Sequence, residues 1–335
     1  MLAPDFERLR TALLLQGEPD YVPKAELWID RSLMSRFMGQ PVETWEQEVA
    51  FWAAAGYDYA HIVPAYQFPK KVKEGSGGHQ FEGLVTCWEG FERYPWPAME
   101  QVDWTPVQRA LVAMPPGMRL ISGTLAGVFE ETWMIMGFET MALSVHDQPE
   151  LLRAVTDKVG SFIVALVERV VALEGVGAVW HSDDIAYKTS TMLSPEAYRR
   201  YIFPWYERIG DLCRQHGLPF LYHSDGSLWR VLDDLKACGF QAIHPIEPLG
   251  MDILELKCRY GEEFCLIGNI GLEYELTLGT PADVEAKVKE RIRQLAPGGG
   301  YCCGSSNTIP AYVPYENYLA MIQAIEKYGR YPIRL

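Results

Sequence analysis

The second half of the chain repeatedly places residues capable of catalysis or metal binding directly after a short apolar run. His223 and Asp225 follow the apolar residues 220–222. Because side chains two apart on a strand share a face, we expect both to point the same way. A His-x-Asp pair can bind a divalent metal, or its carboxylate can orient the imidazole for proton transfer. The purely structural alternative is that Asp225 caps a helix and His223 lies in the core.

Asp183 and Asp184 form a second candidate cluster, just after the apolar residues 178–180. Adjacent strand residues face opposite ways, so at most one of the two carboxylates should point into a pocket. A poorly solvated carboxylate there would have a raised pKa, which suits a catalytic acid or base. His181 shares the face of Asp183 and is a further catalytic candidate. Helix capping or an ion pair is the structural alternative.

The remaining candidates lie at other expected strand ends or in an aromatic stretch. Glu247 stands between two prolines that restrict its backbone, and we expect it to be catalytic. A carboxylate within a barrel strand, as expected at Glu26, is costly unless it is paired or ligating. The side chains expected to contact the substrate are Glu26, Asn269, Asn307, Trp88 and Tyr222.

Helical patterns separate these apolar runs, and the succession of strand, polar tip and helix is typical of a (β/α)8 barrel. The chemistry of such barrels lies at the carboxyl ends of the strands, so the polar tips should converge on one pocket. We therefore predict an α/β fold, a single TIM-barrel domain over residues 1–335, with a helical N-terminal extension at 1–20.

Individual elements follow from periodicity and from glycine and proline positions. Strands are expected at 23–28, 57–64 and 119–123, and long helices at 5–17, 44–55, 149–174, 281–295 and 314–328.

Residues 65–102, after the second expected strand, lack helical periodicity but are rich in aromatic side chains. A long insertion of this kind is more typical of a lid or substrate loop than of a disordered linker. Trp88 is the substrate-contacting candidate within it.

Composition narrows the possible functions. Hydrophobic residues make up 48% of the 335, so a large core is expected. A net charge of −14 argues against nucleic acid or an anionic membrane surface as partner. No apolar run approaches a membrane span, no signal peptide is recognised, and the seven cysteines form no CxxC pair. We expect a cytoplasmic enzyme with a small-molecule substrate; a homodimer is left open.

The strand-end phrases, in their order, resemble the uroporphyrinogen decarboxylase superfamily, which also holds methyltransferases that exchange methyl groups with corrinoid proteins. The resemblance covers roughly residues 175–332 and is carried by His181-Ser-Asp-Asp, Thr191-Met-Leu-Ser-Pro, Tyr222-His-Ser-Asp-Gly, Gly268-Asn-Ile, Leu278-Gly-Thr-Pro, Pro297-Gly-Gly-Gly-Tyr, Ser306-Asn and Val313-Pro-Tyr-Glu-Asn.

Two departures narrow what the resemblance implies. True uroporphyrinogen decarboxylases share an arginine-rich N-terminal segment, which is replaced here by Trp28-Ile-Asp-Arg. The thiol-methylating branch has a zinc site of His-x-Cys plus a later cysteine. Here Asp225 replaces the first cysteine and Asn307 falls about where the second would be, so the donors are oxygen-rich rather than thiolate.

What remains is similar to the branch that demethylates small molecules, such as aryl methyl ethers, and methylates a separate corrinoid protein. The resemblance implies zinc held by His223 and Asp225, cobalamin carried by the partner, and Asp183 or Glu247 as proton donor. The alternative is a metal-free decarboxylase or lyase of a small carboxylic acid, with Asp183 stabilising a protonated intermediate. A catalytically silent binding barrel is a third possibility.

Overall fold

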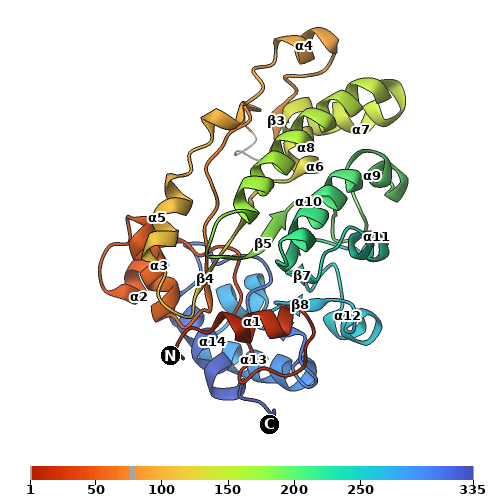
Figure 1. Cartoon of the computed structure of the whole chain (residues 1–335). Coiled ribbons are helices and arrows are strands. Elements are labelled where there is room, and N and C mark those ends of the chain that lie inside the picture. Colours follow the sequence, from red (N-terminus) through yellow and green to blue (C-terminus); the bar gives the residue numbers. More distant parts are fainter. Residues whose placement is uncertain (1, 76–79, 335) are drawn as a thin grey trace.

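A curled parallel sheet forms the centre of the molecule in the computed structural model, which describes residues 2–75 and 80–334 (Figure 1). Its seven strands lie in the order β1-β4-β5-β6-β7-β8-β9, so strands that follow one another along the chain are neighbours. They are β1 (Tyr59–His61), β4 (Arg119–Thr124), β5 (Val176–Ser182), β6 (Phe220–His223), β7 (Ala242–His244), β8 (Cys265–Ile267) and β9 (Tyr301–Cys302).

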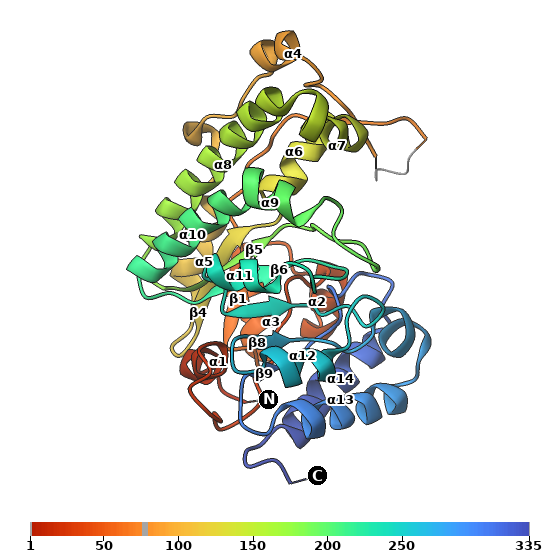
Figure 2. The ribbon, with the colours of Figure 1, turned by 90° about the vertical axis from the view of Figure 1, so that its right-hand side faces the viewer.

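Helices connect the strands and lie around the sheet (Figures 1 and 2). No helix of the described ranges has both the length and the apolar character needed to cross a membrane. The helices are α1 (Phe6–Leu13), α2 (Arg31–Met38), α3 (Trp45–Ala54), α4 (Trp88–Arg93), η1 (Met99–Gln101), α5 (Thr105–Ala113), α6 (Val128–Met136), α7 (Phe138–Asp147), α8 (Pro149–Val171), α9 (Pro195–Tyr201), α10 (Phe203–Gln215), α11 (Leu232–Ala237), α12 (Ile253–Tyr260), η2 (Leu272–Leu278), α13 (Pro281–Leu295) and α14 (Tyr315–Tyr328).

Local sequence signals explain where several of these helices begin. The side chain of Thr280 accepts a hydrogen bond from the backbone of Asp283, and the Asp283 carboxylate accepts one from the backbone of Thr280. This reciprocal cap, together with Pro281 in the first turn, starts α13 at the predicted residue. The helix α1 ends at Leu13, earlier than the predicted 17, although Gly17 follows within four residues.

Residues 22–29 occupy the gap between β9 and β1, where the first barrel strand was expected. The amide of Ala25 donates to the Cys303 carbonyl at 3.1 Å, and the Cys303 amide donates to Pro23 at 2.9 Å. On the other side the Tyr59 hydroxyl is 2.7 Å from both the amide and the carbonyl of Glu26. A tyrosine side chain thus replaces the backbone ladder, which explains why 23–28 forms isolated bridges rather than the predicted strand.

The interior of the sheet is dry and aromatic. All seven residues of β5 are buried, and Trp180 in this strand is fully enclosed. Its ring packs against His61 at 5.5 Å and against His244 at 5.1 Å between centroids. The barrel core therefore contains histidines from β1 and β7 among its aromatic side chains.

The long insertion 65–102 has more structure than the sequence suggested. Within its described part, β2 (Lys71–Val72) pairs antiparallel with β3 (Phe81–Glu82), and α4 and η1 follow. The helix α4 lies at the end of the molecule farthest from the two termini (Figures 1 and 2). Trp88 contacts Phe91 at a centroid distance of 5.6 Å, and Phe91 contacts Trp96 at 5.3 Å. These aromatic side chains pack mainly on one another.

Replacement of Gly304 should test the closure of the barrel. A Cβ at this position would collide with the carbonyl oxygen of Ala25 and would lie 3.1 Å from the Glu26 carboxylate. Gly304→Ala should therefore lower the free energy of unfolding by about 3 kcal/mol or more, because backbone cannot yield cheaply. Urea denaturation measures the change.

Gly17→Ala is the matched control, since Gly17 has a φ of +100° but open space around it. It should cost only the backbone strain of about 1 kcal/mol. Equal losses in the two variants would contradict the closing role of residues 22–29.

Candidate active site

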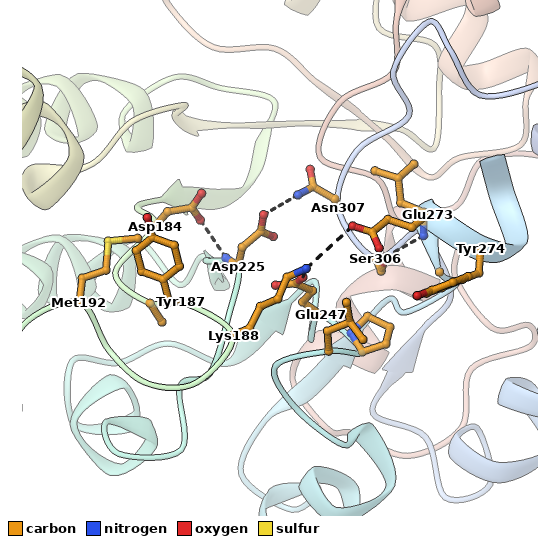
Figure 3. Close-up of a pocket in the computed structure, with 15 residues that line it drawn as sticks. Asp184, Tyr187, Lys188, Met192, Asp225, Glu247, Glu273, Tyr274, Ser306 and Asn307 are labelled. Atoms are coloured by element: carbon orange, nitrogen blue, oxygen red, sulfur yellow. Dashed lines mark hydrogen bonds and ion pairs between the residues drawn. The ribbon is translucent and has the colours of Figure 1, made fainter. Parts of the chain in front are cut away.

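A cavity of about 430 Å3 opens where β5 to β9 end at their carboxyl termini (Figure 3). Four of the residues predicted from the sequence line it, namely Asp184, Asp225, Glu247 and Asn307. They come from separate strand ends that parallel pairing brings to one edge. The other lining side chains are Ala186, Tyr187, Lys188, Met192, Pro248, Leu249, Leu272, Glu273, Tyr274 and Ser306, together with Gly271.

Asp184, His223 and Asp225 offer a group of ligand atoms that lie within 4.8 Å of one another. The backbone amide of Asp225 donates to Asp184 Oδ1 at 2.8 Å, which ties the two loops together (Figure 3). His223 Nε2 is 3.7 Å from the same Asp184 oxygen. Two carboxylates and an imidazole at this spacing match the ligand types that bind divalent cations.

Asp225 has one oxygen engaged and one without a partner. Its Oδ2 accepts a hydrogen bond of 2.6 Å from Asn307 Nδ2, whereas the buried Oδ1 contacts no donor within the described residues. Burial raises the pKa of Asp225 to about 8, and the charges of Asp184 and Glu247 add to this effect. A cation bound here would remove both causes, since it would neutralise the repulsion and fill the open coordination of Oδ1.

His223 lies at the end of β6 with its ring almost wholly enclosed. Burial lowers the pKa of the imidazole, and the nearby Asp184 carboxylate only partly opposes this. The neutral imidazole that results is the form that binds metals. The opposite ring nitrogen, Nδ1, is 2.7 Å from Nδ1 of His244 in β7.

Asp183 points away from the cavity and holds the start of α6. Its carboxylate accepts hydrogen bonds from the amides of Phe129 (2.8 Å) and Glu130 (2.7 Å) and from the Tyr206 hydroxyl (2.6 Å). Burial raises the pKa of Asp183 to about 7, while these three donors oppose the rise. Of the two adjacent aspartates, only Asp184 lines the cavity, in line with the expected alternation.

His181 also lies beneath the cavity and does not line it. Its Nδ1 is 2.8 Å from the Thr124 hydroxyl, and its Nε2 is 3.9 Å from Asp183 Oδ2. Burial lowers the pKa of His181 to about 3, so the ring is neutral over the physiological range. This geometry makes it a neighbour of Asp183 within the barrel wall.

Glu247 faces the cavity opposite the aspartates. Its Oε2 accepts a hydrogen bond of 3.1 Å from the Gly226 amide, which orients the carboxylate. Lys188 Nζ is 3.5 Å from Glu247 Oε1 and 3.9 Å from Glu273 Oε1 (Figure 3). A half-exposed lysine thus bridges two glutamates at the opening, where a substrate group could compete for either charge.

Three of the expected substrate contacts lie elsewhere. Tyr222 is buried and donates its hydroxyl to the Asp183 carbonyl at 2.8 Å. Asn269 is also buried and donates from Nδ2 to the Ile246 carbonyl at 2.9 Å. Trp88 stands at the start of α4 and does not line the cavity.

Glu26 joins residues 22–29 to the end of β9. Its Oε1 accepts from the Ser305 amide at 2.7 Å, and its Oε2 accepts from the Ser305 hydroxyl at 2.6 Å. The side chain is fully buried, and burial raises the pKa of Glu26 to about 8 despite these two donors. The carboxyl is therefore engaged in the barrel wall.

Sequence reasoning missed several lining residues, above all Lys188, Glu273 and the pair Tyr187 and Tyr274. Lys188 and Tyr187 lie in the loop after β5, and the other two lie in η2. Exposed charged and aromatic residues in loops are common, so their type alone gave no signal. Only the nearness of Lys188 to Glu273, which are far apart in sequence, identifies them.

Comparison with known proteins places the chain among related sequences. The sequence profile of the family described as "Uroporphyrinogen decarboxylase (URO-D)" matches residues 104–328. This range begins just before α5 and runs to the end of α14, and so includes every strand end that contributes to the cavity.

The similar curated sequences carry two kinds of name. The chain is 27% identical over 348 residues to a methylated-thiol:coenzyme M methyltransferase of Methanosarcina mazei, covering 96% of this chain and 89% of that protein. It is 26% identical over 158 residues to the methylcobamide:CoM methyltransferase MtaA of Methanosarcina barkeri, with coverages of 46% and 42%. It is also 26% identical over 210 residues to a uroporphyrinogen decarboxylase of Alkalilimnicola ehrlichii, with coverages of 58% and 53%.

Among solved structures, a methyltransferase from Methanosarcina mazei superposes with a TM-score of 0.74. The match covers 96% of this chain and 98% of that chain at 17% sequence identity. The likeness confirms the predicted barrel-type α/β fold.

Glu26→Gln should change how stability depends on pH. The folded pKa of about 8 lies above the usual 4.5, so the folded state holds a proton that the unfolded state loses between these values. The contribution of Glu26 is therefore full at low pH and declines as the pH rises toward 8, by at most about 1.4 kcal/mol per unit. Urea unfolding at several pH values should show a shallower decline in Glu26→Gln than in wild type.

The same change at the exposed Glu43 is the control, and it should leave the wild-type pH dependence in place. Identical slopes for Glu26→Gln and wild type would show that Glu26 does not retain its proton in the fold.

Asp183→Asn should weaken the fold more than it weakens binding of a divalent cation. The amide cannot match three donors that converge on a carboxylate, so the expected loss is about 2 to 3 kcal/mol of unfolding free energy. The neighbouring change Asp184→Asn should give the opposite pattern, a loss of about 1 kcal/mol with a marked loss of cation affinity. Thermal unfolding and zinc titration of both variants test the contrast, and a strong affinity loss in Asp183→Asn alone would refute it.

Proposed function

Because the chain belongs to the uroporphyrinogen decarboxylase (URO-D) family, we propose that it is a methyltransferase that demethylates a small methylated substrate and methylates a separate corrinoid protein. The relative that spans 96% of the chain is named a methyltransferase, as is MtaA. The observation that carries the proposal is the Asp184, His223 and Asp225 cluster inside a cavity of small-molecule size.

The donor set of this cluster fits zinc. Zinc in proteins accepts imidazole nitrogen and carboxylate oxygen, and catalytic sites leave one position for water or substrate. His223 is neutral, and the unpartnered Oδ1 of Asp225 is a buried acceptor that needs a positive partner. His223, Asp225 and Asp184 would hold the metal, which when bound supplies a Lewis acid for the heteroatom that carries the methyl group.

The ligand chemistry also bears on the kind of substrate. No cysteine lines the described cavity, and Asp225 and Asn307 take the places of the thiolate ligands expected in the thiol-methylating branch. Oxygen donors make a harder site than thiolates do. This supports an ether or amine as methyl donor over chemistry that activates a thiol, and we propose an aryl methyl ether or a similar compound.

Other lining residues would bind and orient the substrate. Tyr187 and Tyr274 approach the cavity from opposite sides, from the loop after β5 and from η2, and offer apolar surface to an aryl group (Figure 3). Asn307 holds Asp225 through Oδ2 and so fixes which carboxylate oxygen remains free.

Glu247 is the side chain that would deliver a proton. When the methyl group moves to the reduced corrinoid, the substrate heteroatom keeps the bonding electron pair and takes up a proton. Glu247 lines the cavity and is oriented by the Gly226 amide, whereas Asp183 is enclosed beneath it. Lys188, 3.5 Å from Glu247, can return a proton to that carboxylate.

The partner would be a corrinoid protein that presents its cobalt at the open mouth of the cavity. The proposed location is the cytoplasm, and the homodimer left open by the sequence stays a prediction.

A second candidate function is a metal-free decarboxylase or lyase of a small carboxylic acid. The similarity to uroporphyrinogen decarboxylases over 58% of the chain favours it, as does Lys188, a cation at the mouth that could pair with a substrate carboxylate.

Metal analysis separates the two functions. Wild-type protein should bind about one zinc ion, and His223→Ala should bind it at least about 100-fold more weakly, because even changes outside the ligands cost about 10- to 100-fold. Methyl transfer to a reduced corrinoid protein, followed by cobalt absorbance with methylated ethers, amines and thiols, should fail in parallel. His216→Ala, the same change at an exposed histidine, is the control and should keep both properties.

Metal-free protein that releases carbon dioxide from a small acid would instead establish the lyase. Failure of wild-type protein to methylate the corrinoid from ethers, amines and thiols alike would remove the transfer proposal.

A further inference from the structure

A second histidine contacts the histidine of the candidate metal cluster. We propose that His244 is a positioning residue that keeps the proton of His223 on Nδ1, so that Nε2 is free to bind a divalent cation beside Asp184 and Asp225. The inference rests on the metal site of the proposed function and adds a residue that lies outside the cavity.

The contact between the two histidines follows from the sheet itself. His223 in β6 and His244 in β7 are direct partners in the parallel register. Their Nδ1 atoms are 2.7 Å apart, and their ring centroids are 4.9 Å apart. Both side chains are buried, so water does not compete readily for this bond.

A bond between two imidazole nitrogens has one proton and one lone pair, so its direction decides what His223 can do. If His223 donates, its Nε2 carries the lone pair that a metal needs. If His244 donates, the proton of a neutral His223 moves to Nε2, which cannot then be a ligand. Nε2 is 3.7 Å from Asp184 Oδ1, too far for a good hydrogen bond, so this carboxylate does not secure a proton there.

The surroundings of His244 favour the direction in which it accepts. His61 packs on the same Trp180 ring, and its Nδ1 is 2.6 Å from the Leu27 carbonyl. A carbonyl only accepts, so His61 carries its proton on Nδ1 and a lone pair on Nε2.

Neither Nε2 of His61 nor Nε2 of His244 has a hydrogen-bond partner among the described residues. If His244 accepts at Nδ1, its Nε2 is a donor, which complements the lone pair of His61 in the same interior. If His244 donated at Nδ1, both buried Nε2 atoms would carry lone pairs. The arrangement thus fixes the proton on His223 Nδ1.

Two substitutions at His244 separate positioning from mere packing. His244→Leu removes the acceptor, whereas His244→Asn retains an amide oxygen at the branch that Nδ1 occupies. Zinc affinity, measured by competition with a chromophoric chelator, should fall about 10- to 100-fold in His244→Leu. It should recover to within about fivefold of wild type in His244→Asn, and the visible spectrum of bound Co2+ should recover with it.

His61→Leu is the matched control, because it removes another buried histidine from the Trp180 ring but no bond to His223. Its zinc affinity should stay within about threefold of wild type, while thermal unfolding reports any loss of stability. An equal affinity loss in His61→Leu, or no recovery in His244→Asn, would overturn the positioning role.

A measurement on the wild type covers the case in which His244→Leu does not fold. In zinc-loaded protein with 15N-labelled histidine, NMR should show a slowly exchanging proton on His223 Nδ1 and none on His244 Nδ1. A proton on His244 Nδ1 would overturn the inference. Zinc bound tightly by a folded His244→Leu variant would overturn this role alone, whereas wild-type protein that binds no zinc would overturn the metal site as well.

Discussion

Parallel pairing of β5, β6 and β7 is the constraint on which the site depends. The register aligns Ser182 with His223 and His223 with His244, so these three strands end at one level. Residues that follow these ends must then lie around the same opening, and Asp184, Asp225 and Glu247 do so. The same register produces the bond between the two histidines. A shift of one residue would reverse the side-chain faces and would dissolve both the cavity and the candidate metal cluster.

The carboxylates of the barrel divide according to how many donors they receive. Asp183 accepts three hydrogen bonds and Glu26 accepts two, so these groups are already satisfied and hold backbone segments together. Asp225 receives one side-chain donor and keeps an empty, buried oxygen that faces other carboxylates. Burial of an unsatisfied anion is costly unless a cation or proton joins it. This imbalance, more than the number of acidic residues, marks the place where a ligand belongs.

Family membership and chemistry are separate conclusions for this chain. Relatives named as methyltransferases and as decarboxylases match the same barrel, and a barrel of this kind supports many reactions through its strand-end loops. The difference must lie in the donors at the mouth. Here these are one imidazole, several carboxylates and a lysine, with tyrosines on both sides and no thiol among the described lining residues.

The amino-acid sequence by itself determined the order of strand, polar tip and helix, because apolar periodicity and caps are local properties. The start of α13 at Pro281 and the candidacy of His223 and Asp225 follow from it. Only the tertiary structure decided which of Asp183 and Asp184 faces the cavity, because strand twist and the amides of α6 compete for them. It also decided that Lys188 meets Glu247 and that His244 contacts His223. Such pairs are set by the register between strands, and no local pattern of residues encodes that distance.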